Sequence, residues 1–230
     1  MAAIMNDQRQ LTVQGEKRKT QLLECAAELF AEHGYAETRV VDIVRAAGVA
    51  KGLFYWYFEN KAALFTELVV ANRERLRRAQ FAAIDLSATP LQQIRQGAEA
   101  SLLFMAERAP FFALLEVENV NRAFADVLRV GTDIHTADTK QLIEVGIERG
   151  AIRDDDAELL ALGVVGAVGY YGHFHRTGRT TGPMNELAHF VGRFVVCSLA
   201  ADEEIARQVL DPSTQEVATP GSSASNLATR

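Results

Sequence analysis

The stretch 38–61, TRVVDIVRAAGVAKGLFYWYFENK, has the layout of two short helices joined by a tight turn. Apolar residues recur at helical spacing after Thr38, a favourable N-cap, so a first short helix is predicted from about Arg39. Gly48 ends it, because glycine readily adopts the left-handed conformation that lets a chain leave a helix sharply. A second helix follows from about residue 50 to 58, with one face for a core and aromatic residues left over elsewhere. This layout is typical of a helix-turn-helix.

Two further helices are predicted to flank this motif. The earlier one spans about 16–33 and ends at Gly34, with Tyr35 as the hydrophobic contact of a Schellman-type ending. The later one begins after Asn60, a second favourable N-cap, and runs to about residue 84. Because it starts beside the motif and ends in the next part of the chain, we interpret this long helix as a lever.

Two phrases, LFAEHGY at 29–35 and DIVRAAGVAKGLFYWYFENKAAL at 42–64, are similar to the N-terminal signature of TetR-family (tetracycline-repressor-type) transcription regulators. The resemblance is ungapped over roughly 20–68, about a fifth of the chain. It implies that the second motif helix enters the major groove of an operator. By position, it assigns DNA contacts to these residues: Thr38, Arg39, Lys51, Gly52, Leu53, Tyr55, Trp56, Tyr57 and Lys61.

The chemistry of these side chains agrees with such roles. A lysine or a tyrosine hydroxyl can donate to phosphate, and lysine can also donate to guanine O6 or N7. Gly52 has no side chain to block close approach. Two alternatives stay open, since Leu53 either touches a thymine methyl or packs, and Trp56 is either a contact or mainly structural.

Charge is divided unevenly along the chain. The 230 residues carry a formal net charge of −6, which by itself is unusual for a DNA-binding protein. Residues 1–61, however, hold eight basic and eight acidic side chains, so the deficit lies after residue 61. Because few phosphate contacts are expected, affinity for DNA would come from two copies of the helix-turn-helix that bind together.

Several function classes find no support in the sequence. Cys25 and Cys197 are isolated, and no secretory signal accompanies them, so we expect buried thiols in a cytoplasmic protein. The longest apolar run, 159–171, is shorter than the roughly 20 residues that span a bilayer. His173 and His175 lack companion ligands, and no nucleophile elbow, phosphate loop or HExxH motif occurs. We therefore expect no metal, no cofactor, no membrane association and no enzyme activity.

The sequence predicts an all-α fold with four segments. These are a flexible arm at 1–15, a helix-turn-helix domain at 16–61, a helical effector-binding and dimerisation domain at 62–210, and a disordered tail at 211–230. Helices in the third segment are predicted from Pro90, after Pro110, over about 121–149, and at about 154–175 and 183–201.

The family resemblance implies that the last two of these helices meet their copies in a second subunit. Glycines at every third position of 163–172 cost helix stability, which close approach of a partner helix or of a ligand would offset. The residues assigned to the dimer interface are Gly163, Gly166, Leu187, Phe190, Val191, Phe194 and Val195.

Aromatic residues of the C-terminal part are candidates for lining an effector pocket, although each is equally consistent with an ordinary core. They are Phe104, Phe111, Phe112, Phe124, Tyr170, Tyr171 and Phe174. Their composition favours a bulky apolar or aromatic effector.

We therefore predict a homodimeric, ligand-responsive regulator that binds a palindromic double-stranded DNA operator, and a repressor rather than an activator. Two alternatives remain at this stage. One is a small-molecule-binding protein of the same fold without operator recognition, and the other is an adaptor whose apolar C-terminal helices meet a foreign chain.

Overall fold

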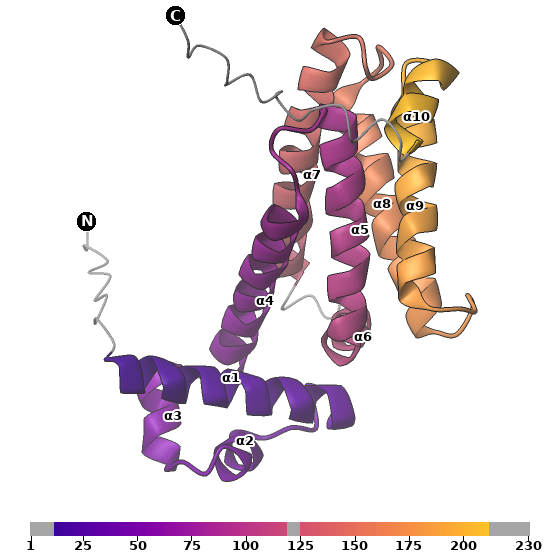
Figure 1. Ribbon diagram of the computed structural model, residues 1–230. Helices are drawn as coiled ribbons and strands as arrows, with labels where there is room; N and C mark the ends of the chain where they lie inside the picture. Colours follow the sequence, from indigo (N-terminus) through magenta and orange to yellow (C-terminus); the bar gives the residue numbers. More distant parts are fainter. Residues whose placement is uncertain (1–11, 119–124, 212–230) are drawn as a thin grey trace, which may run out of the picture.

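The computed structural model describes residues 12–118 and 125–211, which fold into ten helices arranged in two lobes (Figure 1). The only extended pairing in these ranges is a single bridge between Ile152 and Ala200, so the all-α prediction is confirmed. The helices are α1 (Val13–His33), α2 (Val40–Ala46), α3 (Lys51–Tyr57), α4 (Lys61–Ala83), α5 (Pro90–Glu107), α6 (Ala109–Glu118), α7 (Ala125–Glu148), α8 (Ala157–Arg176), α9 (Met184–Leu199) and α10 (Glu203–Leu210).

Two boundaries in the lower lobe differ from the predicted ones. Helix α1 begins at Val13 because the Thr12 side chain accepts a hydrogen bond from the Gly15 amide, so part of the predicted arm is helical. Arg39, and not Thr38, occupies the N-cap of α2, and its backbone amide donates to the Asp42 side chain. The rest of the arm, 1–11, and the tail beyond residue 211 lie outside the described residues.

The lower lobe contains α1, α2, α3 and the first turns of α4. Gly48 has φ +61°, and the Val49 amide donates to the Val44 carbonyl, so α2 ends in the left-handed turn that the sequence predicts. Inside the lobe, the rings of Phe30, Tyr35 and Phe65 meet at centroid distances of 5.2–5.9 Å. This aromatic cluster fixes α1 against the start of α4.

The upper lobe is a helical bundle around α5, which lies against α4, α7, α8 and α9. Pro90 sits in the first turn of α5, and a capping box between Thr89 and Gln92 starts the helix. Helix α10 was not predicted from the sequence, although Ile205 and Val209 recur at helical spacing in it. Its Val209 carbonyl accepts a hydrogen bond from Arg95 of α5.

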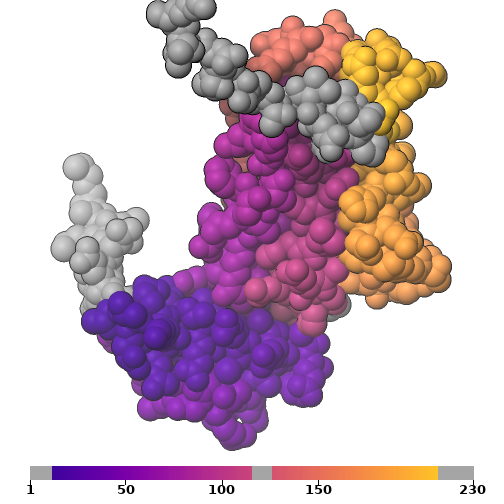
Figure 2. Space-filling model, viewed as in Figure 1, coloured from indigo at the N-terminus to yellow at the C-terminus, as the bar shows by residue number. Residues whose placement is uncertain are grey.

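Helices α4 and α6 join the two lobes. The first half of α4 buries Leu64, Phe65, Leu68 and Val69 in the core of the lower lobe, and its second half lies against α5 and α7. Helix α6 sits at the lower end of the bundle and contacts α1 (Figures 1 and 2). Any change of shape in the upper lobe therefore reaches the lower lobe through these two helices.

Within the described ranges, none of the helices combines the length and the apolar character that crossing a membrane requires.

The aromatic cluster yields a stability prediction. Phe65→Ala removes a fully buried ring, so we expect the free energy of unfolding to fall by about 3–5 kcal/mol. Phe81→Ala on the same helix is the matched control, because Phe81 is 69% exposed and its loss should change stability by less than about 0.5 kcal/mol. Urea denaturation of the two variants measures both values, and similar losses would contradict the assigned core.

Candidate functional sites: the α3 face and a cavity beside α4

Helix α3 divides its residues between a core face and a free face. Phe54 and the C-cap residue Phe58 are buried, at 0% and 2% exposure, and anchor the helix on the lower lobe. On the other side Tyr55 and Trp56 are 51% and 48% exposed. Singly exposed apolar side chains are common on protein surfaces, but these two large aromatic residues stand together on one short helix, and an exposed patch of this kind is informative.

The first turn of α3 adds a cation and an open backbone to this face. Lys51 and Gly52 are both exposed, and a Cβ added at Gly52 would meet no atom within 4 Å. The Lys51 ammonium lies 5.9 Å from the centre of the Tyr55 ring. We call Lys51, Gly52, Tyr55 and Trp56 the α3 face; all four were predicted to contact DNA.

Two other predicted DNA contacts have structural roles instead. The Thr38 side chain is buried, and its hydroxyl donates to the carbonyls of Leu29 and Gly34. The Lys61 ammonium donates to the carbonyls of Tyr35 and Thr38 at 2.5 and 2.7 Å. Both side chains tie the end of α1 to the segment before α2, which favours structural roles over the predicted contacts with the DNA backbone.

The remaining motif residues are neither fully exposed and unbonded nor buried inside the lobe. The Tyr57 hydroxyl donates to the Gly15 carbonyl at 2.9 Å, so its proton is used to fix α3 on α1 and not offered to a phosphate. Leu53 is half-buried, consistent with its packing alternative. Arg39 is exposed, and its guanidinium forms two hydrogen bonds to Asp42, which hold the pKa of that carboxyl below its ordinary value. Arg39 thus meets DNA only if it exchanges Asp42 for a phosphate.

Lys61 and Lys51 form a matched pair for testing this division. Lys61→Met leaves several carbonyls without their charged donor, so we expect the free energy of unfolding to fall by about 2 kcal/mol. Lys51→Met removes an exposed ammonium and should leave stability within about 0.5 kcal/mol of the parent protein. Thermal and urea denaturation report the difference; a Lys61 variant as stable as the Lys51 variant would refute the structural role.

The second candidate site is a cavity of about 440 Å³ in the upper lobe, within the range of small-molecule pockets. Its walls come from the second half of α4 and from α5, α6, α7 and α8. Most of the lining is aliphatic or aromatic, as with Leu76, Ile94, Met105, Phe112 and Val168. The cavity thus lies against both helices that join the lobes.

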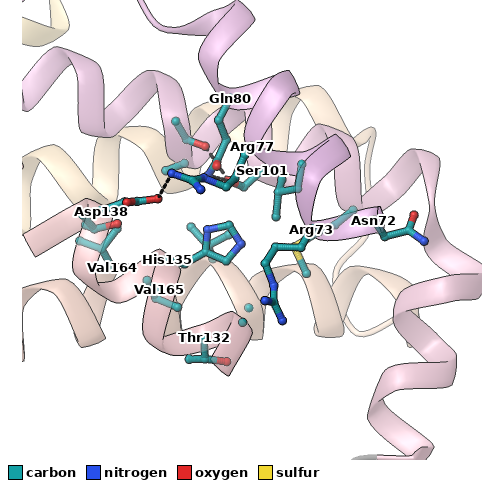
Figure 3. A pocket seen from close by; sticks show the side chains of 18 of the residues that line it. Asn72, Arg73, Arg77, Gln80, Ser101, Thr132, His135, Asp138, Val164 and Val165 are labelled. Carbon is teal, nitrogen blue, oxygen red and sulfur yellow. Dashed lines mark hydrogen bonds and ion pairs between the residues drawn. The ribbon is translucent and has the colours of Figure 1, made fainter. Parts of the chain in front are cut away.

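Polar groups gather where α4 faces α7 (Figure 3). Arg77 forms an ion pair with Asp138 at 3.2 Å, and Arg73 donates to the Val127 carbonyl at 2.8 Å. The His135 ring lies between the Arg73 side chain and this ion pair. Burial lowers the pKa of His135, and the neighbouring arginines lower it further against the opposing effect of Asp138. His135 is therefore neutral near pH 7.

One further polar atom in the wall is unpaired. Asn72 is 4% exposed, and its amide nitrogen donates to the Leu68 carbonyl. Its side-chain oxygen accepts no hydrogen bond within the described part of the chain. This atom suits a hydroxyl or another donor on a bound molecule.

Two of the predicted effector residues line this cavity, and four do not. Phe111 and Phe112 line the cavity, but Phe104 does not, since its buried ring packs on Phe112. Tyr170 is 68% exposed on the outer side of α8, where it contacts Phe174, and neither lines the cavity. Phe124 lies outside the described residues.

Tyr171 also lies outside the cavity, because its ring packs on Phe190 and Phe194 of α9.

Sequence reasoning missed the polar residues of the cavity. Arg73 and Arg77 were not among the predicted effector residues, yet they continue the stripe of Val69 at intervals of four. This i, i+4 spacing from a buried residue was the signal that could have identified them.

The predicted dimer residues also divide into two groups. Val191 and Val195 are 0% and 1% exposed inside the protomer core, so their assignment to an interface is wrong. Phe190 and Phe194 are about half exposed, Leu187 is half-buried, and Gly163 and Gly166 face open space. The two phenylalanines lie one turn apart, so they share a face of α9.

Helix α8 continues this surface. Leu159, Leu162 and Tyr170 are 65%, 47% and 68% exposed and share one helical face with Gly163 and Gly166. Contacts of Tyr171 with Phe190 and Phe194 connect it to α9. We call the surface formed by Leu159, Leu162, Gly163, Gly166, Tyr170, Phe190 and Phe194 the α8–α9 face. Exposed apolar side chains that gather in this way form a surface suited to a partner.

The lower lobe is the part of the chain that matches a known protein family. Residues 22–68 match the family model described as bacterial regulatory proteins, tetR family. The chain is 35% identical over 104 residues to the probable acrEF/envCD operon repressor of Escherichia coli (strain K12), an alignment that covers 44% of this chain and 46% of that protein. The chain thus spans about half the length of this curated relative.

Other relatives extend the similarity into the upper lobe. An uncharacterized HTH-type transcriptional regulator of Bacillus subtilis (strain 168), YhgD, is 27% identical over 160 residues, covering 63% of this chain and 76% of that protein. Among solved structures, the fatty acid degradation regulator FadR from Bacillus halodurans matches with a TM-score of 0.66 at 20% identity, covering 77% of this chain and 94% of that one. PfmR from Thermus thermophilus, a TetR family transcriptional regulator, matches with a TM-score of 0.63 at 24% identity, covering 76% and 96%. These structures share the two-lobed helical fold.

Proposed function

The chain belongs to the TetR family of bacterial regulatory proteins, and from this premise we propose that it represses transcription as a homodimer on a palindromic operator, from which a small molecule releases it. The observation that carries the proposal is the α3 face, a cation and two half-exposed aromatic residues on the second helix of a helix-turn-helix. In this arrangement α3 lies in the major groove, where Lys51 reaches base edges or a phosphate and the Tyr55 hydroxyl donates to a phosphate.

The orientation of α3 is supported by three side chains of the motif, Thr38, Tyr57 and Lys61. Their hydrogen bonds run to α1 or to the segment that follows it, so they fix the angle at which α3 projects. A reader that is rigid before binding loses less conformational entropy on DNA. Their contribution to affinity is therefore preorganisation.

Lys51 provides the test of the DNA-binding proposal. Lys51→Ala should weaken binding to a promoter fragment, selected from genomic DNA with the parent protein, by about tenfold, since a good lysine contact to a base is worth roughly 1–3 kcal/mol. Fluorescence anisotropy at fixed salt measures the affinity. Lys140→Ala is the matched control because Lys140 lies on α7 and pairs with Glu158.

Equal affinities of the Lys51 and Lys140 variants would exclude α3 as the reader. Failure of the parent protein to bind any fragment with steep salt dependence would favour the alternative of a small-molecule-binding protein without an operator.

The homodimer rests on the α8–α9 face. Exposed apolar side chains and open glycines allow a second copy of the same two helices to approach closely, which gives a four-helix interface with twofold symmetry. Two copies of α3 would then face successive major grooves, about 34–36 Å apart. Neither copy alone has enough cationic contacts for tight binding, so the dimer is required for affinity.

Phe194→Arg tests this interface. It places a charge in the proposed contact, so we expect light scattering to report half the mass found for the parent protein at the same concentration. Leu86→Arg changes a side chain that is 66% exposed in the segment between α4 and α5, and this control should keep the parent mass. A Phe194 variant of unchanged mass would place the dimer contact elsewhere.

Release from DNA follows from the position of the cavity. The same α4 that lines it with Arg73, Leu76 and Arg77 has its first half in the core of the lower lobe. A molecule that binds one arrangement of α4 more tightly than another shifts the population toward it, and so changes the separation of the two readers.

A further inference from the structure

The cavity carries an excess of positive charge at one end. Arg73 and Arg77 are four residues apart on α4, so their side chains lie on the same side of the helix, and both line the cavity. Asp138 faces them from α7 and forms an ion pair with Arg77. No ion pair of Arg73 is found among the side chains of 12–115 and 126–211. Two guanidinium groups thus share one carboxylate.

His135 does not change this balance. His135 belongs to α7 and lies beside Arg73 and Arg77 of α4. It is neutral near pH 7, because burial disfavours its charged form and so lowers its pKa. A neutral imidazole can still donate a hydrogen bond from one ring nitrogen. The α4–α7 end of the cavity therefore holds one uncompensated positive charge and further donors.

Gly131 makes room for the Arg73 guanidinium. A Cβ at Gly131 would lie 2.7 Å from Nη2 of Arg73, so any other residue at this position would force the guanidinium to move. Glycine inside a helix costs roughly 0.8–1 kcal/mol relative to alanine, and Gly131 lies within α7. Arg73 donates one of its five N–H groups to the Val127 carbonyl, which leaves the others for a ligand.

The remainder of the cavity is suited to an apolar body. Its other walls are largely aliphatic and aromatic, and at about 30 Å³ for each water-sized group the 440 Å³ holds roughly fifteen non-hydrogen atoms. The unpaired Asn72 oxygen is an acceptor and repels an anion placed against it. An anionic group is therefore favoured at the His135 end.

We propose that the effector is an amphipathic carboxylic acid whose carboxylate lies between Arg73, Arg77 and His135 and whose apolar part fills the cavity toward α5 and α8. Its role as effector rests on the proposed function, but its binding does not. An arginine and a carboxylate form a bidentate pair of charge-assisted hydrogen bonds, which explains selection for the acid over a neutral molecule of the same shape.

The test is calorimetric titration of the full chain, without DNA, with decanoate and with decan-1-ol, which share an alkyl chain and differ in charge. We expect decanoate to bind at least tenfold more tightly than the alcohol at pH 7.5. Equal affinities, or tighter binding of decan-1-ol or decylammonium, would overturn the proposal.

Three variants then locate the carboxylate. Arg73→Met should lower decanoate affinity about tenfold and leave decan-1-ol binding within twofold, while Arg78→Met, an exposed arginine of α4 outside the cavity, should change neither. Asp138→Asn should raise decanoate affinity about threefold, because it frees Arg77 from its partner. An unfolded variant cannot produce this gain, so a loss or no change with Asp138→Asn counts against the site.

A separate measurement keeps this proposal distinct from the regulatory one. Decanoate that binds the free protein, yet leaves its affinity for the selected promoter fragment unchanged, would support the ligand class and contradict release from DNA.

Discussion

A single continuous helix that belongs to two cores is the constraint on which the rest of this structure depends. The first half of α4 is fixed in the lower lobe by Phe65 and its neighbours, and the second half forms a wall of the cavity. At 1.5 Å per residue its 23 residues extend over roughly 35 Å, and every internal backbone hydrogen bond resists bending. A displacement at the cavity therefore reaches the lower lobe as a movement of the whole helix.

Helix α6 supplies a second connection between the lobes. Phe111 and Leu114 are buried in the core cluster that contains α1 residues, while Phe112 and Leu115 line the cavity. Ion pairs between α1 and α4, Lys19 with Glu67 and Arg75 with Glu24, add a surface link. Exposed pairs of this kind contribute little stability, so the apolar contacts of α6 are the stronger coupling.

The division of labour within the helix-turn-helix has a simple physical cause. A short helix has too little surface to hold its own orientation, and the bonds of Thr38, Tyr57 and Lys61 to neighbouring carbonyls supply what packing cannot. The same bonds engage these groups inside the lower lobe. The exposed surface of α3 is thereby left to the side chains of the α3 face.

The sequence by itself determined the all-helical fold, most helix boundaries and the location of the helix-turn-helix, because caps, glycine turns and apolar periodicity act within a few residues of one another. Helical spacing separated Lys51, Gly52, Tyr55 and Trp56 from the core face of α3, and the structure leaves all four exposed. Only the tertiary structure decided which polar groups already have hydrogen-bond partners. The Lys61 ammonium, for example, donates to the carbonyls of Tyr35 and Thr38, which lie more than twenty positions earlier in the chain. The tertiary structure alone also brought Arg73 of α4 to His135 of α7, since contacts between distant segments depend on how helices pack and leave no local pattern in the sequence.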